Sequence, residues 1–262
     1  SYPESTHSSN SRGLNMVLSE LFRQNAEIVM TESEYSIQAM LDKTYRVLVR
    51  FLGKPPSQFK WEYSVSDPDK SKLSKFIDTT PMSFAKEFCK INLDDYVSYT
   101  NDPRNSYNKL YGVEYLGNVW GGNKVRYLNV DMDRIRTLVR ESIDANDPVW
   151  FGSDVGQVYH RKTAVLDKER FAYLRFLGIE DLLSKKSRID TCQSLMTHAM
   201  VFSGYHKDQY GKIDWYEIEN SWGSDGPYGG SLVCTDQWFG EYVYQLVTKK
   251  KLATKSELVI WN

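Results

Sequence analysis

Apolar positions in the first part of the chain recur with the spacing of amphipathic helices. Residues 14–28 place them every three or four positions, and residues 37–52 repeat the pattern. Between these segments, Thr31 and Glu34 have the spacing of a capping box, which predicts that the second helix starts there. The Gly-Lys-Pro-Pro sequence at 53–56 then predicts a helix end.

Further along the chain, two more segments have helical features. Thr80 followed by Pro81 has the arrangement of an N-cap and a first helical residue, and residues 132–143 again place apolar side chains on one helical face. Residues 96–126 are rich in Asn, Asp, Gly and Tyr, which predicts an ordered loop region. The first half of the chain is therefore predicted to be helical and loop-rich.

The second half has the pattern of strands. Residues 148–155 form a short apolar run, as do residues 198–205, which are followed by turn residues at 206–211. Residues 212–220 alternate between apolar and charged side chains, and residues 229–236 give another strand candidate. Strands separated by turns favour an antiparallel sheet, and helices followed by strands indicate the α+β class.

This second half contains three further features. The alternation places Tyr216, Ile218 and Asn220 on one face of their strand. Residues 168–178 predict a helix, whereas residues 238–247 are compatible with a helix, a strand or both.

Composition narrows the class of protein. The 262 residues suit one large domain or two closely associated ones, and an aromatic content of 14% is enough for a sizeable core. No apolar run reaches the ~20 residues that a membrane helix needs. The polar start of the chain lacks the apolar stretch of a signal peptide.

Charge and cysteine content exclude further classes of partner and cofactor. The 33 basic and 34 acidic residues leave a net charge of -1, so nucleic acid and anionic lipid are not expected partners. Cys89, Cys192 and Cys234 lie far apart in the sequence, which favours free thiols in a reducing compartment. The cysteines and the 4 histidines show no ligand spacing, so we expect no metal site.

One pair of polar residues stands out from this pattern. A hairpin turning at 206–211 would bring His198, at the start of one strand, close to Asn220, at the end of the next. An Asn amide oxygen can fix the tautomer of an imidazole and leave its other nitrogen facing a nucleophile. Trp222 could cover that hydrogen bond. Taken singly, a core histidine and a turn asparagine remain the simpler interpretations.

Several longer strings resemble one family. The sequence is similar to the bleomycin hydrolase and aminopeptidase C family of papain-like cysteine peptidases over essentially its whole length. The similarity lies in the strings "YPESTHSSNSRGLN", "KWEYSVSDPDK", "NDPRNSYNKLYGVEYLGNVWGG", "VWFGSDVG", "SLMTHAMVFSGY", "WYEIENSWGSDG" and "TDQWFGEYVYQLV".

The resemblance implies a fold and a set of site residues. Residues 1–125 would be the helical and loop-rich inserted region of the family, and residues 126–262 the β-rich half of a papain-like catalytic domain. His198 would be the general base and acid, Asn220 the residue that orients it, and Trp222 the indole that shields the pair.

The same resemblance suggests a substrate cleft beside the catalytic histidine. Its wall could include Ser153, Asp154, Met196 and Ala199. Each of the four also has a structural interpretation, as a core residue or, for Asp154, as a turn residue at the end of a strand.

The family's nucleophile is a cysteine that follows a glutamine, upstream of the "YPES" segment. None of the three cysteines here stands in that context, so we expect the nucleophile on a segment absent from this chain, and the chain alone to be inactive. The family's C-terminal carboxylate tail, which makes it an aminopeptidase, is not evident in "SELVIWN". An endopeptidase-like variant therefore stays an alternative.

The resemblance also implies partners and a location. We expect peptide substrates, the Cys-bearing N-terminal segment of the same protein as a partner, a homo-hexamer and a cytoplasmic location. No membrane association and no cofactor are expected, and nucleic-acid binding is disfavoured. The alternative of a different class is an inactive fragment or a non-catalytic paralogue that acts as a scaffold.

Overall fold

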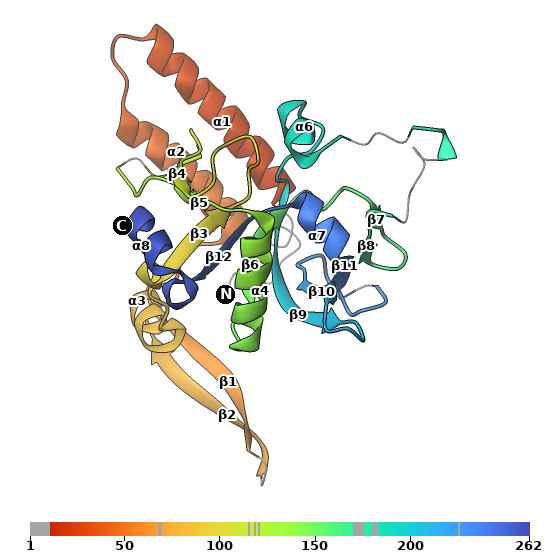
Figure 1. Cartoon of the computed structure of the whole chain (residues 1–262). Helices are drawn as coiled ribbons and strands as arrows, with labels where there is room; N and C mark the ends of the chain where they lie inside the picture. Colours follow the sequence, from red (N-terminus) through yellow and green to blue (C-terminus); the bar gives the residue numbers. More distant parts are fainter. Residues whose placement is uncertain are drawn as a thin grey trace. The chain divides into compact units, whose positions relative to one another are not determined.

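A computed structural model describes residues 11–67, 70–114, 116–117, 119, 121–169, 176–179, 183–224 and 226–262, without the side chains of residues 64–75. The chain divides into two compact units, Ser1–Ile91 and Asn92–Asn262. Figure 1 labels the helices and strands of both units.

The first unit begins with two helices, α1 (Arg12–Thr31) and α2 (Ile37–Leu52), at the positions that the apolar spacing predicted. Gly53 ends α2 with a φ angle of 81°, in the left-handed region that glycine adopts without strain. The helix end predicted from the Gly-Lys-Pro-Pro sequence is thus confirmed.

The predicted capping box between the two helices is wrong. Thr31 is still helical, and its hydroxyl donates to the carbonyl oxygen of Glu27 at 2.8 Å, so it does not pair with Glu34 as a cap. Ser36 caps α2 instead, because its side chain accepts a hydrogen bond from the backbone N–H of Ala39 at 3.2 Å.

The expectation of a helical first half is wrong for the segment after α2. Here β1 (Phe59–Asp67) and β2 (Lys70–Thr79) pair as an antiparallel hairpin. The sequence carried a signal for it, since apolar residues alternate with polar ones at the start of β1. Phe59 and Trp61 point to the same face, where both rings contact Phe84.

The helix start predicted at Thr80 is confirmed. Thr80 caps α3 (Pro81–Phe84), with Pro81 as its first residue, and the helix continues into a π-helical turn at Ala85–Cys89.

The second unit is built on a mixed sheet. Among its described residues, ten strands follow the order β4-β5-β3-β12-β6-β9-β10-β11-β8-β7, with parallel pairing at β3–β5 and β8–β11 and antiparallel pairing elsewhere. The strands are β3 (Tyr96–Thr100), β4 (Lys109–Tyr111), β5 (Tyr127–Asn129), β6 (Val149–Ser153), β7 (Tyr159–His160), β8 (Val165–Leu166), β9 (His198–Lys207), β10 (Ile213–Glu219), β11 (Leu232–Thr235) and β12 (Val243–Lys249).

Four helices of this unit accompany the sheet in the described part of the chain, together with two short 3-10 turns. The helices are α4 (Met132–Asp144), α6 (Lys185–Asp190), α7 (Asp236–Tyr242) and α8 (Lys255–Trp261), and the turns are Leu93–Asp95 and Lys250–Leu252.

Most sequence predictions for this unit are confirmed. The apolar runs became β6, β9, β10 and β11, and the ambiguous segment at 238–247 is both helix and strand, since α7 leads directly into β12. The helix predicted at 168–178 falls largely outside the described residues. The α+β class is confirmed, with a sheet that is mixed where an antiparallel one was expected.

The loop region expected at 96–126 contains two strands, so that expectation is wrong for β3 and β4. Val97 and Tyr99 are fully buried on alternate positions of β3, which pairs with β12 and β5. The division between the compact units therefore lies between Ile91 and Asn92, earlier than the predicted division at 125/126, because β3 and β4 belong to the large sheet.

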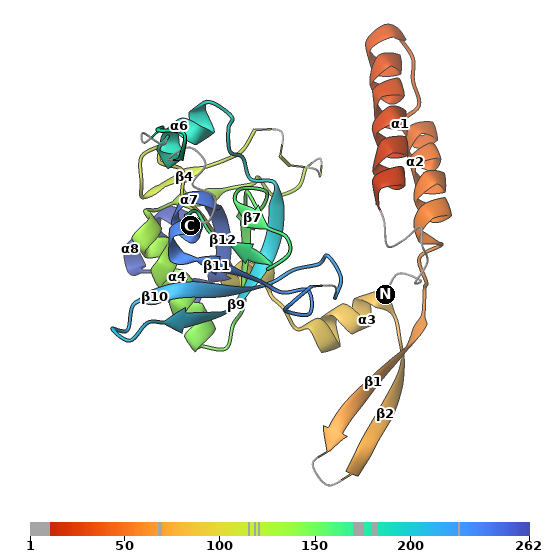
Figure 2. The same cartoon turned by 90° about the vertical axis from the view of Figure 1, so that its right-hand side faces the viewer.

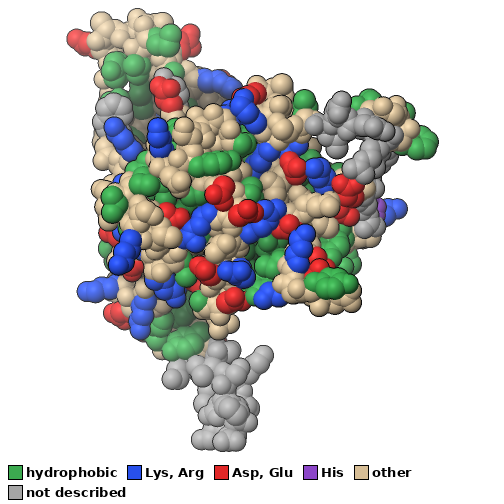
Figure 3. All heavy atoms as spheres, viewed as in Figure 1, with side chains coloured by type: hydrophobic (Ala, Val, Ile, Leu, Met, Phe, Trp, Pro, Cys, Tyr) green, Lys and Arg blue, Asp and Glu red, His purple; other side chains and the backbone are tan. Residues whose placement is uncertain are grey.

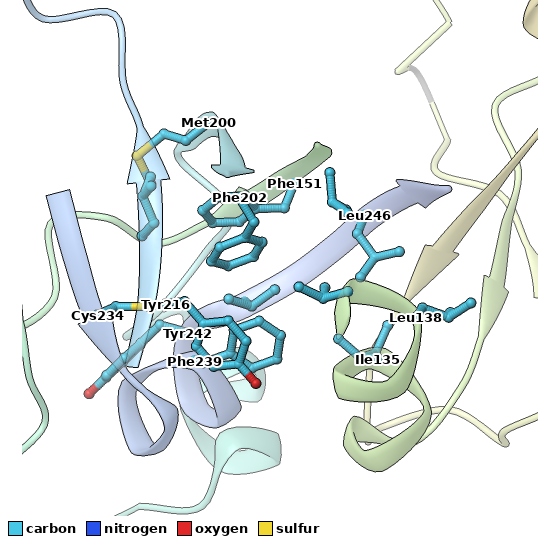
Figure 4. Packing of buried hydrophobic residues seen from close by; sticks show 14 of the residues in the cluster. Ile135, Leu138, Phe151, Met200, Phe202, Tyr216, Cys234, Phe239, Tyr242 and Leu246 are labelled. Carbon is cyan, nitrogen blue, oxygen red and sulfur yellow. The ribbon is translucent and has the colours of Figure 1, made fainter. Parts of the chain in front are cut away.

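The core of this unit lies between the central strands and the helices α4 and α7 (Figure 4). Phe151 of β6 and Phe202 of β9 stack with ring centroids 3.7 Å apart. Tyr216 of β10 and Phe239 of α7 stack in the same cluster at 4.4 Å. This packing holds β6, β9 and β10 rigidly side by side, which matters for the residues at their ends.

The charges on the surface and the apolar character of the helices agree with the composition of the sequence. On the face in Figure 3, basic and acidic side chains are interspersed, in keeping with the near-balanced charge of the sequence. In the part of the chain that the structure describes, no helix has the length and apolar character needed to cross a bilayer.

Candidate active site

The hairpin of β9 and β10 brings the two residues singled out by the sequence together. The strands run antiparallel and side by side (Figures 1 and 2), with Val201 opposite Glu219. His198 is the first residue of β9, and Asn220 directly follows the last residue of β10. The start of one strand therefore lies beside the end of its neighbour.

The side chains of His198 and Asn220 are hydrogen-bonded. Nε2 of His198 lies 2.9 Å from Oδ1 of Asn220, which also accepts the backbone N–H of Ser221 at 2.8 Å. Because an amide oxygen can only accept, Nε2 carries the hydrogen of the neutral imidazole. Nδ1 is then the nitrogen with a free lone pair, which a general base requires.

An aromatic layer covers this hydrogen bond on one side. The indole of Trp222 stacks on the imidazole of His198, with ring centroids 5.0 Å apart and 28° between the planes. Tyr159 of β7 packs against the same indole at 5.8 Å. The sequence placed Trp222 here, but it gave no signal for Tyr159, which reaches the site only through the sheet order.

The four predicted cleft residues divide into two pairs. Met196 and Ala199 are exposed, whereas Ser153 is fully buried and Asp154 nearly so. Ser153 pairs with His198 across β6 and β9, and within the described residues its hydroxyl has no hydrogen-bond partner. Of these four residues, only Met196 and Ala199 contribute exposed surface near the start of β9.

Met196 is held over a glycine. A Cβ atom at Gly152 would lie 2.8 Å from Cγ of Gln245 and 3.0 Å from Cγ of Met196. Real Cβ atoms do not tolerate the contact with Gln245, and the one with Met196 is tight, so the absence of a side chain at Gly152 leaves room for both side chains there.

Asp154 accepts hydrogen bonds from four groups. Its Oδ2 accepts from Ser194 Oγ at 2.8 Å, from Gln157 Nε2 at 3.1 Å and from the backbone N–H of Leu195 at 3.3 Å. Its Oδ1 accepts from Thr197 Oγ1 at 3.3 Å. A buried carboxylate requires such donors, because desolvation without them would cost several kcal/mol.

The helix α6, upstream of these residues, is anchored by a buried lysine. Nζ of Lys185 donates to Oδ1 of Asn101 at 2.8 Å and to the carbonyl oxygens of Val243 at 2.6 Å and Gly240 at 3.3 Å. Burial lowers the pKa of Lys185 to about 7, because the ammonium is removed from water without a carboxylate in contact.

An ion-pair network anchors the same helix a second time. Glu241 of α7 accepts from Arg188 of α6 and, at 2.7 Å, from Lys168. Burial opposes ionisation of Glu241, but the hydrogen bonds from Lys168 and Arg188 outweigh it and lower the pKa of this carboxyl.

The three cysteines have different environments. Cys234 is fully buried in the core, and burial raises the pKa of its thiol, which opposes formation of a thiolate. Cys192 is exposed after α6 and lies near the guanidinium of Arg104. Cys89 belongs to the other compact unit.

Two of the other histidines make contacts of their own. His206 pairs with Asp214 on the exposed hairpin at 2.7 Å, and His160 contacts Thr163 at 2.7 Å. His7 lies outside the described residues. Within the described ranges, no three His, Cys, Asp or Glu side chains gather in an arrangement that could hold a metal ion.

Comparison with known proteins places the chain in a family. All of it, residues 1–262, matches the Peptidase C1-like family. The chain belongs to the Peptidase C1-like family. This confirms the resemblance to the bleomycin hydrolase and aminopeptidase C family that its motifs indicated.

Named members of the Peptidase C1-like family match along the whole chain. Aminopeptidase C of Lactococcus lactis subsp. cremoris is 41% identical over 269 residues, which cover 100% of this chain and 61% of that protein. Bleomycin hydrolase of Rattus norvegicus is 34% identical over 275 residues, which cover 99% of this chain and 60% of that protein.

A solved structure agrees with the fold. The crystal structure of PepW from Lactobacillus rhamnosis HN001 superposes with a TM-score of 0.89 at 37% sequence identity, over 99% of this chain and 60% of that chain. This Peptidase C1-like chain therefore spans about three fifths of the length of the relatives it matches.

Proposed function

We propose that the protein containing this chain is a cysteine peptidase that cleaves peptide bonds with a Cys–His–Asn triad. The hydrogen bond between Nε2 of His198 and Oδ1 of Asn220 carries the proposal, because it leaves Nδ1 of the imidazole available to a thiol. Membership of the Peptidase C1-like family supports it.

The mechanism assigns one task to each residue. His198 accepts the thiol proton at Nδ1, and the resulting thiolate attacks the scissile carbonyl carbon. The imidazolium then gives that proton to the leaving amine, so an acyl-enzyme remains on the cysteine. A water molecule, deprotonated by the same nitrogen, attacks the thioester and releases the carboxylic acid and the thiol. Asn220 keeps the imidazole in one orientation throughout.

The nucleophile is proposed to come from outside these 262 residues. Cys234 is buried in the core with a raised thiol pKa, and Cys192 lies near Arg104. Neither environment is that of a thiol beside His198, and none of the three cysteines has the Gln-then-Cys-Trp context of the resembled family. On this proposal the chain alone does not turn over substrate.

Aminopeptidase action is the favoured reaction. Relatives named aminopeptidase C are 33–41% identical to this chain, which supports release of residues from the free N-terminus of peptides. An endopeptidase-like variant is the alternative, because the residue that would bind the substrate's amine is not identified in this sequence.

The proposal extends to assembly and location. A homo-hexamer in the cytoplasm is proposed from the resemblance of the motifs. In the first unit, exposed apolar side chains of α1 and α2 support burial against a partner; they are Met16, Phe22, Met30, Ile37 and Leu41. Nucleic acid is not a proposed partner, because the net charge is -1.

Hydrolysis of fluorogenic amides by the full-length protein tests the function. We expect release from aminoacyl amides, loss of that activity after treatment with a thiol alkylator, and no turnover by residues 1–262 alone. A matched amide with a blocked N-terminus is the control for aminopeptidase action, and its equally rapid cleavage would favour the endopeptidase alternative.

Two other outcomes would count against the proposal. Hydrolysis that is indifferent to the alkylator would contradict the cysteine mechanism. If the intact mass of the native protein matched these residues alone and no second polypeptide co-purified, the non-catalytic scaffold would be the better interpretation.

A further inference from the structure

The segment 194–197 directly precedes β9, so its conformation sets where His198 begins the strand. Three of its residues donate hydrogen bonds to the same carboxylate, that of Asp154. The donors are Ser194 Oγ at 2.8 Å, the Leu195 backbone N–H at 3.3 Å and Thr197 Oγ1 at 3.3 Å.

Asp154 itself is fixed from the opposite side. Its backbone N–H donates to the carbonyl oxygen of Tyr242 at 3.0 Å, and only 6% of the residue is exposed. The preceding residue, Ser153, pairs with His198 and accepts the backbone N–H of Thr197 at 3.0 Å. The backbone of Ser153 and the side chain of Asp154 thus hold the segment 194–197 and the backbone of His198 together.

A tyrosine extends the same network to β12. The hydroxyl of Tyr244 lies 2.6 Å from Ser194 Oγ. Since the single proton of Ser194 goes to Asp154, Tyr244 is the donor in this contact. Burial raises the pKa of Tyr244, so the phenol keeps its proton over the working range of pH.

The chain upstream of the segment is anchored without Asp154. Lys185 binds α6 to backbone carbonyl groups of α7 and β12, and Arg188 binds α6 to a carboxylate of α7. Residues 194–197 are therefore the connection between an anchored helix and the strand that carries His198. Their side-chain and backbone donors to Asp154 decide how that connection runs.

We infer that Asp154 is a positioning residue, which aligns the imidazole of His198 with Asn220 by binding the segment 194–197. Its effect on turnover rests on the proposed function, but its effect on the geometry of His198 does not. Asp154 acts through the segment and does not contact substrate.

Two substitutions separate hydrogen bonding from charge. Asp154→Ala removes both carboxylate oxygens, and a small misplacement of a catalytic group can cost on the order of 10²-fold in kcat. In Asp154→Asn, the side-chain oxygen can accept from the three donors that bind Oδ2 in the wild type. The amide nitrogen can donate to the Thr197 hydroxyl, which can accept. We expect kcat to fall in the Ala variant with KM little changed, and to recover largely in the Asn variant.

Glu257→Ala is the matched control for loss of a buried carboxylate. Glu257 pairs with Arg134 at 2.7 Å and contacts no residue of the segment 194–197. This variant should lower the melting temperature and leave kcat unchanged. An equal loss of kcat in the Glu257 variant would overturn the inference, because it would make instability the cause.

Long-range 1H–15N spectra of the imidazoles provide a readout that needs no activity. The chain has 4 histidines, so His198→Gln assigns the signal of interest. Asp154→Ala should shift or broaden the His198 signals, and Asp154→Asn should restore them. If the Ala variant does not fold, Ser194→Ala, which removes one donor and the link to Tyr244, should give a smaller change of the same kind.

The two readouts also distinguish the inference from the proposed function. Absence of alkylator-sensitive hydrolysis in the wild type would refute the function, while the spectra would still decide whether Asp154 positions His198. Unchanged His198 signals in Asp154→Ala, or in Ser194→Ala where the former does not fold, would overturn the inference.

Discussion

Nε2 of His198 lies 2.9 Å from Oδ1 of Asn220, although 22 positions separate the two residues in the chain. The antiparallel hairpin of β9 and β10 produces this contact, because it returns the chain to the end of the sheet where β9 began. The bond fixes which imidazole nitrogen carries the hydrogen, and therefore which nitrogen can act as a base.

On the proposed function, removal of either partner should lower turnover by the full-length protein, to different extents. In His198→Ala, no group remains to move the proton, so kcat should fall by at least about 10³-fold. In Asn220→Ala the imidazole stays but is free to rotate, and a loss on the order of 10²-fold is expected. Steady-state kinetics on an aminoacyl amide measures both values. Wild-type kcat/KM in the His198 variant would contradict its assigned role.

Removal of the Trp222 indole should expose the hydrogen bond between His198 and Asn220 to water. In Trp222→Ala we expect kcat to fall and the Nε2 proton of His198 to exchange faster with solvent, as measured by imidazole NMR. Because 49% of Trp222 is exposed, the melting temperature should change little. Trp222→Phe retains a ring at this position and should lie between the two; an exchange rate equal to the wild type's in Trp222→Ala would contradict shielding.

A side chain at Gly152 should displace Gln245 and push Met196 aside by a smaller amount. The added Cβ of Gly152→Ala would meet Cγ of Gln245 at 2.8 Å and Cγ of Met196 at 3.0 Å. We expect a loss of about 1–3 kcal/mol in the free energy of unfolding, as for an overpacked core. Since the displaced Met196 borders the proposed cleft, KM should rise more than kcat falls.

Gly156→Ala is the control for that variant, because its new Cβ meets nothing closer than 3.9 Å. It should match the wild type in both unfolding and kinetics. An unchanged KM in Gly152→Ala, with the expected loss of stability, would remove Met196 from the cleft wall.

Stability should depend on pH through Lys185. Its pKa of about 7 in the folded protein is below the ordinary value of 10.5, so the unfolded chain holds this proton more tightly. The contribution of Lys185 to the free energy of unfolding is therefore lowest below pH 7 and increases as the pH rises toward 10.5. Between pH 7 and pH 9 the gain is up to about 2 kcal/mol.

Denaturant titrations of the wild type and Lys185→Met at pH 7 and pH 9 measure that gain. The difference in free energy of unfolding between the two proteins should change by this amount between the two pH values. Lys186→Met is the matched control, because Lys186 lies next in α6 and is exposed in a pair with Asp190. Its difference from the wild type should stay constant. A constant difference for Lys185→Met as well would contradict the expected proton linkage.

The sequence predicted much of the local structure. Helical spacing located α1, α2 and α4, and apolar runs located β6, β9, β10 and β11. It failed for β1, because the alternation there is short and lies in a half of the chain where helical spacing prevails. It also failed at Thr31, where the helix simply continues, because a cap depends on where the chain bends and not on spacing alone.

For the site, the sequence by itself singled out His198, Asn220 and Trp222, since their types and motif context suffice to suggest a triad and its cover. Only the tertiary structure decided which neighbours hold them. Asp154 meets the segment 194–197, and Tyr244 meets Ser194, because β6 lies between β9 and β12 in the sheet. Such contacts join positions far apart in the chain, and no local periodicity encodes the order in which strands pair.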